Sequence, residues 1–372
     1  MPPAPAEAAP QTTIGGVNGA EGYYHYRGYS ASELAAERSY EDVWHLLAVG
    51  DLPDKEHAAA FADATRPARR LPPGLEPALE RIAATGVAPH DGLRAALPLL
   101  APALALRPLL DTAPDVRRRE GLALTAVLPT AVAALHRLSR GEPVVPPRDD
   151  LGTAANYLYM LTGTEPSGEH ARALERYLVA VMDHGLSVCA YAARVVASTG
   201  TDLAAAVAGA LAALGGPLHG GAPGRVLDTL TAIGTPDRAD AWLRDRMAGG
   251  GRVPGFGHAV YAGEDPRTRL LREVATRLGG DLAELALAVE RRVPELYAEL
   301  RPGRTLHSNV EFYAAVVQTL CGLPPDLLTA TFACGRVVGW CAHVAEQADT
   351  GRRPITPGAR YAGPQPPREL PT

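Results

Sequence analysis

Apolar residues recur at intervals of three and four through almost the whole chain after residue 30. Because side chains three and four positions apart share one face of an α-helix, this spacing predicts an all-α fold. Aromatic residues are only 5% of the chain, so we expect Ala, Leu and Val to build most of the core. The periodic segments are 55–65, 75–85, 91–107, 117–139 and 168–198, and further helices fit 223–233, 236–248, 266–278, 281–300, 309–321 and 325–347.

The first thirty residues differ from the rest. Residues 1–12 are rich in proline and alanine and predict a disordered tail. Residues 14–29 mix glycine with tyrosine, which favours a short hairpin or an extended loop. Ser39 stands three residues before Asp42, and this capping-box pattern predicts the start of a helix that ends at Gly50.

One expected helix, residues 202–214, has small apolar residues on nearly all its sides. Asp202 is a good N-cap, and Gly215 lies just beyond the end. A helix with one face in water normally carries charge on that face, and this helix carries none. We therefore expect it to be buried on all sides, as happens at a subunit interface.

Charge and hydropathy narrow the class of protein. The net charge of −5 is spread without a basic stripe, so nucleic acid is not an expected partner. The N-terminus lacks the basic and apolar regions of a signal peptide. The most apolar run, Leu122 to Leu135, is too short to span a bilayer and contains Pro129. We therefore expect a cytoplasmic protein without a membrane partner.

The cysteines predict neither a metal site nor a disulfide framework. None forms a C-x-x-C pair, and none has a histidine at a metal-ligand spacing. In a cytoplasmic protein such thiols are reduced and mostly buried. We expect this of all four, which are Cys189, Cys321, Cys334 and Cys341.

Two glycine-rich stretches each contain a histidine. His219 lies in residues 215–222, GGPLHGGA, and His258 lies in residues 254–261, PGFGHAVY. Glycine lets the backbone approach a ligand closely and adopt unusual dihedral angles. Each histidine, taken alone, is also compatible with a purely structural role.

Charged residues follow both stretches in places that core packing does not favour. Arg267 begins a helix in the sequence DPR, Glu311 lies in the first turn of an apolar helix, and Arg336 lies on a helix whose other faces are apolar. Glu311 is also compatible with a carboxylate favoured by the helix dipole, and either arginine with an ordinary ion pair. The combination of the residues, rather than any single one, predicts a site.

These segments resemble the citrate synthase family. The runs GPLHGGA, GFGHAVY with DPR, and NVEFY stand in the order and spacing of that family, and NYLYMLTGTEP and AARVVASTGTDL also match it. The resemblance covers about residues 13–364. It implies the all-α citrate synthase fold, in which a large domain (13–218 and 318–372) carries an inserted small domain (219–317) and the active site lies in the cleft. The family is at least dimeric.

The resemblance also implies roles for single residues. His219 resembles the histidine that hydrogen-bonds the thioester carbonyl and stabilises the enol. Glu311 stands at the position of the base that removes the α-proton, which is aspartate in many members. His258 resembles the histidine that polarises the ketone of oxaloacetate. The remaining matches, all in the 2-oxo acid pocket, are His184, Arg267 and Arg336.

Such a set of residues suits the chemistry. The α-proton of a thioester is a weak acid, so a carboxylate removes it only when a fixed donor stabilises the developing enolate oxygen. Two arginines are natural clamps for a substrate with two carboxylates. Coenzyme A arrives as part of the substrate, so no cofactor and no metal ion is implied.

Two positions depart from the family pattern. Thr356 stands where the family usually has an arginine that reaches the substrate of the other subunit. Ser187 stands where the family has the asparagine of a His-x-x-Asn motif, which begins here at His184. Both departures bear on 2-oxo acid binding. One interpretation is sequence drift at these two positions, for which neighbouring residues compensate. The other is an altered preference for the 2-oxo acid that accepts the acyl group, or low activity.

The leading hypothesis is a citrate synthase that condenses acetyl-CoA with oxaloacetate as a homodimer, with a hexamer as the alternative assembly. The nearest alternative is a 2-methylcitrate synthase using propionyl-CoA, because one methyl group provides only about 1–3 kcal/mol of discrimination. A catalytically weak or silent CoA-binding member is the third hypothesis. The presence of His219, His258 and Glu311 argues against it, whereas Thr356 and Ser187 favour it.

Overall fold

The described residues are predominantly helical, with one small sheet, which confirms the all-α prediction. The tail predicted for residues 1–12 lies outside the described residues except for its last two positions. The computed structural model describes residues 11–221, 223–258, 260–350, 353–365 and 367–368.

A small antiparallel sheet begins the fold. Its strands β1 (Gly15–Asn18), β2 (Tyr23–Tyr26) and β3 (Tyr29–Ser30) follow one another in the order β1-β2-β3. Residues 14–29 therefore form paired strands, as in the predicted hairpin and not the alternative extended loop. The buried Tyr26 hydroxyl donates to the Val179 carbonyl at 3.0 Å and so attaches the sheet to the end of α8 (Gly168–Ala180).

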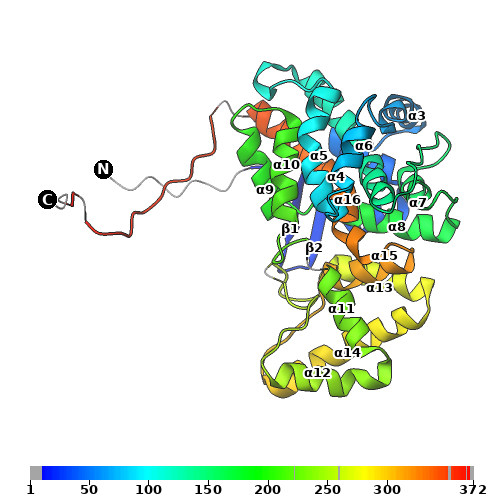
Figure 1. Ribbon diagram of the computed structural model, residues 1–372. Helices are drawn as coiled ribbons and strands as arrows, with labels where there is room; N and C mark the ends of the chain where they lie inside the picture. Colours follow the sequence, from blue (N-terminus) through cyan, green and yellow to red (C-terminus); the bar gives the residue numbers. More distant parts are fainter. Residues whose placement is uncertain (1–10, 222, 259, 351–352, 366, 369–372) are drawn as a thin grey trace.

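Most helices form a larger group around α16 (Leu328–Thr350), which packs against α2, α6, α8, α9 and α10 (Figure 1). A short 3-10 turn, Pro325–Leu327, precedes α16. The other helices of this group are α1 (Ala31–Glu37), α2 (Tyr40–Val49), α3 (Lys55–Thr65), α4 (Glu76–Ala83), α5 (Pro89–Ala103), α6 (Pro114–Ser139), α7 (Thr153–Thr162), α9 (Val188–Ala197) and α10 (Leu203–Leu214).

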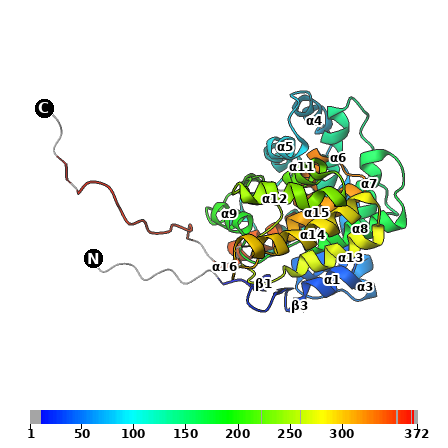
Figure 2. The ribbon, with the colours of Figure 1, turned by 90° about the horizontal axis from the view of Figure 1, so that it is seen from below.

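A smaller group of helices lies below the larger one in Figure 1 and in front of it in Figure 2. Two of its members, α13 and α15, pack on each other and on α8, so they join the two groups. The helices of the smaller group are α11 (Pro223–Ile233), α12 (Ala239–Ala248), α13 (Pro266–Leu278), α14 (Asp281–Leu300) and α15 (Val310–Leu320).

The predicted capping box is present at the start of α2. The Ser39 hydroxyl accepts from the Asp42 backbone N–H at 3.1 Å, and the Asp42 carboxylate accepts from the Ser39 N–H at 3.4 Å. The helix ends at Val49, where Gly50 adopts a φ of +125° that a residue with a side chain rarely adopts. Both predicted boundaries of this helix are confirmed.

The periodic run 168–198 forms two helices rather than one. The chain leaves the helical path between α8 and α9, where Gly185 has a φ of +57° and its N–H is taken by the Asp183 carboxylate at 2.9 Å. Ser187 then becomes the N-cap position of α9. The apolar spacing continues across the break because α8 and α9 both pack against α16. Periodicity alone could therefore not reveal the break.

Within the single chain, helix 202–214 is not buried on all sides, so its predicted burial would need a second subunit. The face formed by Leu203, Val207, Leu211 and their neighbours is buried. The opposite stripe is only partly covered, and Ala212 is exposed. The small residues pack closely on one neighbour, since a Cβ on Gly209 would lie 2.9 Å from the Val196 side chain of α9.

Among the residues that the structure describes, two helices are long and apolar enough to cross a membrane by length and composition alone. They are Pro114–Ser139, which contains the shorter run singled out in the sequence, and Pro325–Thr350. However, 83% and 89% of their most apolar windows are buried inside the structure. Both helices thus form the core of the larger group.

Candidate active site

His184 lies in the break between α8 and α9, and its neighbours on both sides are held in place. The Asp183 backbone N–H donates to the Tyr26 hydroxyl at 3.2 Å. The fully buried Asp183 carboxylate accepts from the Gly185 N–H at 2.9 Å and lies 3.0 Å from Nε2 of the buried His343. These contacts fix the direction in which His184 leaves the backbone.

A glycine of α16 lets this helix approach the break. A Cβ on Gly339 would lie only 2.3 Å from the Met182 carbonyl oxygen, so any larger residue would push α16 away. The close approach brings Arg336, on the same helix, to the break, where its Nε donates to the Val181 carbonyl at 2.5 Å. Arg336 is 1% exposed.

His258 presents one ring nitrogen to the site. Its Nδ1 accepts from the backbone N–H groups of Val260 at 2.9 Å and Tyr261 at 3.2 Å. The proton of the neutral ring therefore lies on Nε2. Burial and then the charge of Arg267 lower the pKa of His258, which favours the neutral ring. His258 thus offers a single N–H donor, at Nε2.

A second neutral histidine lies beside the first. His184 Nε2 is 2.9 Å from the Tyr261 hydroxyl, and the ring centroids of His184 and His258 are 5.8 Å apart. Burial, followed by the charges of Arg267 and Arg336, lowers the pKa of His184 well below its ordinary value. The two arginines therefore supply the positive charge here, and the histidines supply neutral hydrogen-bonding groups.

Asp265 orients Arg267 and ties the start of α13 to the start of α15. Its carboxylate accepts from Nε of Arg267 at 2.9 Å and from Nη2 at 2.7 Å, and it also accepts from the Val310 backbone N–H at 3.2 Å. Arg267 Nη2 then lies 3.3 Å from His258 Nε2. Because both nitrogens carry hydrogens, they converge on a position that suits an acceptor oxygen.

Glu311 lies in the first turn of α15, which is joined to the loop of His258. The Asn309 side chain caps this helix by accepting from the Glu311 N–H at 3.0 Å, and its amide donates to the Gly257 carbonyl at 2.8 Å. Burial raises the pKa of Glu311 to about 7, although the charges of His219 and Arg267 oppose the rise. Glu311 is therefore a carboxylate poised near neutral pH.

His219 follows α10 and lies beside Cys189, at the start of α9. Burial alone would raise the pKa of Cys189, but its contact with His219 and the charge of Arg336 outweigh burial and lower the pKa to about 6. The sulfur is 3.6 Å from Arg336 Nη1 and 3.4 Å from the Ser187 hydroxyl. Within the described part of the chain, the buried Nε2 of His219 has no hydrogen-bond partner.

The predicted site residues gather where the two groups of helices meet. His184, His258 and Arg267 lie in direct contact, with Arg336 on the adjoining break. The charge of His219 affects the pKa of both Glu311 and His184, so His219 lies within electrostatic range of each of them. In the described ranges, no group of three or more His, Cys, Asp or Glu residues is arranged to hold a metal ion.

Comparison with known proteins identifies the family of this chain. A family described as citrate synthase, C-terminal domain, matches residues 6–358. The chain belongs to the citrate synthase family. It is 36% identical to the citrate synthase of Haloferax volcanii over 354 residues, which cover 93% of this chain and 91% of the relative. It is accordingly an acyltransferase enzyme of the citrate synthase type.

Solved structures of citrate synthases share the fold. The enzyme from Pyrobaculum aerophilum superposes with a TM-score of 0.86 at 35% identity, over 97% of this chain and 92% of that one. The enzyme from Thermoplasma acidophilum, described as a ternary complex with carboxymethyl coenzyme A and oxaloacetate, gives a TM-score of 0.87 at 24% identity over 98% and 96%. The helical citrate synthase fold predicted from the sequence is thus confirmed.

Sequence reasoning missed several residues around the candidate site. Tyr261 and Asp265 stand within the GFGHAVY and DPR motifs, yet only the histidine and arginine of these motifs were singled out. Asp183 directly precedes His184. Cys189 was grouped with the other cysteines, although its position two residues after Ser187 placed it at the same helix start. Proximity to a chosen residue was the signal available for all four.

Proposed function

We propose that the protein condenses the acetyl group of acetyl-CoA with oxaloacetate and hydrolyses the product thioester to citrate and CoA. The observation that carries the proposal is Glu311, a partly buried carboxylate with a pKa of about 7 that lies within electrostatic range of His219. A base of this pKa is ionised in a useful fraction at neutral pH and is stronger than an ordinary carboxylate. The other carboxylates described in the site, Asp183 and Asp265, are already occupied by hydrogen bonds to neighbouring groups.

Enolisation needs a donor as well as a base. In our proposal Glu311 takes the α-proton, while Nε2 of His219 donates to the thioester oxygen as negative charge develops there. The buried and unpartnered state of that nitrogen within the described residues supports this role. Loss of one such donor typically costs about 3–4 kcal/mol of transition-state stabilisation.

In the same proposal, the 2-oxo acid would bind against His258. His258 Nε2 donates to the ketone and makes its carbon more electrophilic, and Arg267, Arg336 and His184 hold the carboxylates. The convergence of His258 Nε2 and Arg267 Nη2 at 3.3 Å supports this assignment, because an acceptor oxygen placed near both would relieve the opposition of two donors. The ligands of the Thermoplasma acidophilum enzyme, carboxymethyl coenzyme A and oxaloacetate, belong to the same two classes as the substrates proposed here.

A cavity beside the His258 loop suits part of the coenzyme. It has a volume of about 260 Å³ and lies between the end of α12, the end of α14 and the glycine loop. Arg252 and Arg301 line it together with the aromatic ring of Tyr297. Arginines and a ring are suitable partners for phosphate and adenine.

We also propose the domain division and a homodimer. Residues 219–317 would act as the small domain, which closes against the domain formed by 13–218 and 318–372 and excludes water until the new bond forms. The hydrogen bond between His184 and Tyr261 supports this, since it joins the two parts. The partly uncovered stripe of small residues on α10, with the exposed Val188 on α9, supports a subunit interface there.

A thiol-release assay tests the function. CoA release should require acetyl-CoA and oxaloacetate together, and it should fall about 10²–10³-fold in His219→Ala. Glu311→Gln should be at least as inactive, whereas Glu284→Gln, on the exposed side of α14, serves as the matched control. CoA release that is independent of oxaloacetate would contradict the proposal.

The same assay separates the two acyl substrates. We expect kcat/KM with acetyl-CoA to exceed that with propionyl-CoA at saturating oxaloacetate. One methyl group allows a ratio of roughly 10–200. A ratio below one would instead identify a 2-methylcitrate synthase with the same catalytic residues.

A further inference from the structure

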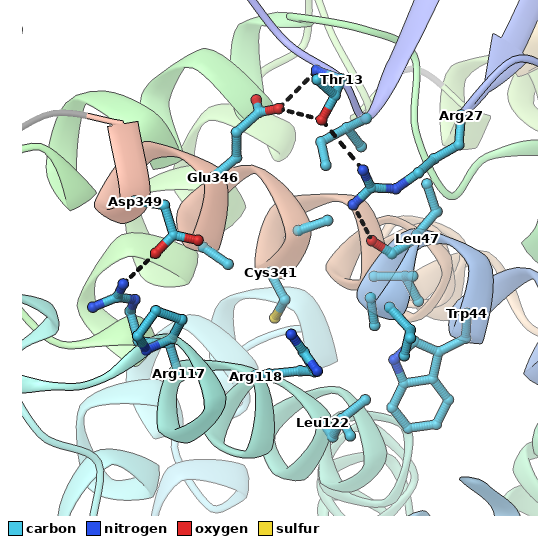
Figure 3. Close-up of a pocket in the computed structure, with 18 residues that line it drawn as sticks. Thr13, Arg27, Trp44, Leu47, Arg117, Arg118, Leu122, Cys341, Glu346 and Asp349 are labelled. Atoms are coloured by element: carbon cyan, nitrogen blue, oxygen red, sulfur yellow. Dashed lines mark hydrogen bonds and ion pairs between the residues drawn. The ribbon is translucent and has the colours of Figure 1, made fainter. Parts of the chain in front are cut away.

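A cavity of about 250 Å³ lies between the end of α2, the start of α6 and the second half of α16 (Figure 3). Among the described residues it shares no lining side chain with the candidate active site. Its apolar wall is formed by Trp44, Leu47, Leu122 and Val338. Small-molecule sites are commonly a few hundred Å³ with an apolar lining and a few placed polar groups, so this cavity suits a compact ligand.

The polar groups of this cavity leave positive charge unpaired. Arg27, Arg117 and Arg118 line it together with Glu346 and Asp349 (Figure 3). The Asp349 carboxylate forms an ion pair with the Arg117 guanidinium. Neither Arg27 nor Arg118 has a carboxylate within ion-pair distance in the part of the chain that the structure describes.

The charge of Glu346 acts on Arg27 without a direct ion pair, because the Glu346 oxygens are bonded to other donors. Its carboxylate accepts from the Thr13 backbone N–H at 2.7 Å and the Thr13 hydroxyl at 2.8 Å, and it pairs with the buried Arg194. Although burial would raise the pKa of Glu346, these hydrogen bonds lower it to about 2. The carboxylate is therefore fully ionised and fully occupied.

Arg27 lies in the turn between β2 and β3, and it lines the cavity. It has a φ of +47°, which a residue with a side chain rarely adopts. Its guanidinium donates to the Thr13 hydroxyl at 3.2 Å and to the Leu47 carbonyl at 3.0 Å, both neutral acceptors. Its buried Nε has no hydrogen-bond partner among the described residues. An incoming anion would supply the missing counter-charge.

A chain of contacts leads from this cavity to the break that carries His184. Arg194, the partner of Glu346, has its Nη1 3.4 Å from His343 Nδ1. Because Nδ1 faces this donor, the ring proton of neutral His343 lies on Nε2, which faces Asp183 at 3.0 Å. Asp183 in turn holds the backbone of Gly185. A change at Thr13 or Glu346 therefore has a continuous route to the oxaloacetate pocket.

We propose that this cavity is a regulatory site for a compact organic anion, with a carboxylate or phosphate group between Arg27 and Arg118 and an apolar part against Trp44. Bound anion competes for Arg27, weakens its contact with Thr13 and loosens the contacts that end at Asp183. Oxaloacetate then binds less tightly. This effect on the active site rests on the proposed function, whereas the binding itself does not.

Binding is tested by calorimetry on the full chain without substrates. Benzoate is the probe, benzamide its uncharged counterpart, and inorganic phosphate the charge without the apolar part. We expect benzoate to bind at one site per chain, phosphate more weakly and benzamide not at all. Arg118→Gln should weaken benzoate about three- to tenfold, because a charge-assisted hydrogen bond is lost.

The neighbouring Arg119 provides the matched control. It pairs with Asp115 four residues before it and does not line the cavity, so Arg119→Gln should leave the affinity unchanged. Equal loss in both variants, or equal binding of benzamide and benzoate, would overturn the site. Because no substrate is present, this result is independent of whether the protein makes citrate.

Linkage tests the regulatory part. Saturating benzoate should raise the KM for oxaloacetate about fivefold. By reciprocity, bound oxaloacetate should lower the affinity for benzoate by the same factor by which benzoate lowers the affinity for oxaloacetate. The effect on KM should be smaller in Arg118→Gln at the same benzoate concentration. Benzoate that binds but leaves the KM unchanged would overturn regulation.

Discussion

His184 Nε2 and the Tyr261 hydroxyl lie 2.9 Å apart, and they belong to the two different groups of helices. His184 comes from the break between α8 and α9, and Tyr261 from the loop that precedes α13. Tyr261 also shapes the other histidine, because its backbone N–H donates to His258 Nδ1 at 3.2 Å. One residue thus contacts both histidines of the proposed oxaloacetate pocket.

Tyr261→Phe tests the contribution of this contact. The backbone N–H to His258 remains, so only the hydroxyl bond to His184 is lost. A single hydrogen bond of this kind contributes about 0.5–1.5 kcal/mol, so we expect the KM for oxaloacetate to rise several-fold. The effect on kcat should be smaller, since the reacting groups stay in place.

The control for Tyr261→Phe is Tyr29→Phe, which removes a hydroxyl from a 46% exposed tyrosine of β3. Steady-state kinetics with varied oxaloacetate separate KM from kcat. An unchanged KM in Tyr261→Phe would show that the hydroxyl does not contribute to forming the pocket.

The raised pKa of Glu311 sets the pH dependence of the reaction. A base must be ionised to accept a proton, so kcat/KM for acetyl-CoA should rise with pH and level off above a midpoint near 7. An ordinary glutamate would place this midpoint near its usual value of 4.5. Initial rates in buffers of constant ionic strength measure the profile, and a midpoint below about 5 would contradict the assignment.

The same shift has a consequence for stability. The folded pKa of Glu311 lies above its ordinary value, so the folded protein binds this proton more tightly than the unfolded chain. Its contribution to stability is therefore present below pH 4.5 and is lost as the pH rises through about 7. Glu311→Gln should consequently raise the Tm relative to the parent protein at pH 8 but not at pH 4, as measured by calorimetry.

Much of this fold and site follows from the sequence because it depends on local rules. The capping box at Ser39 and the glycine at position 50 define a helix through interactions within a few residues of each other. The glycine motifs around His219 and His258 likewise act locally, since glycine is needed wherever backbone and ligand approach closely.

What the sequence did not reveal depends on packing between distant segments. The break at Gly185 is held by contacts with α16 and β2, and no other element of the described chain fully covers the stripe on α10. The low pKa of Cys189 arises from His219 and Arg336, which lie thirty and 147 residues away along the chain. Apolar periodicity and residue type contain no information about these neighbours.

Cys189 provides a spectroscopic test of the active-site electrostatics. Its pKa of about 6 contrasts with Cys321 and Cys341, whose pKa values burial raises to about 12, and with Cys334, which is raised further still. Thiolate absorbance in the ultraviolet should therefore show one transition with a midpoint near 6 between about pH 4 and 9.

Cys189→Ser should abolish this transition, whereas Cys321→Ser should leave it unchanged. The serine variant should stay active, because a hydroxyl can still hydrogen-bond to Arg336 and His219. A thiol midpoint at or above about 8.5, the value of an unperturbed cysteine, would show that His219 and Arg336 do not stabilise the thiolate.

Thr356 is exposed on a C-terminal segment that is attached to the body where the Ile355 N–H donates to the Ser198 hydroxyl at 2.9 Å. The segment leaves the larger group on the side of α9 and α10 and extends away from the chain's own site (Figure 1). In a homodimer this course would take it toward the partner subunit, where the family usually places an arginine near the substrate.

Thr356→Arg should therefore supply a missing carboxylate partner and lower the KM for oxaloacetate about three- to tenfold, as a charge-assisted hydrogen bond does. Thr356→Gln, which adds length without charge, should not, and an equal KM in all three proteins would show that this segment lies outside the carboxylate site.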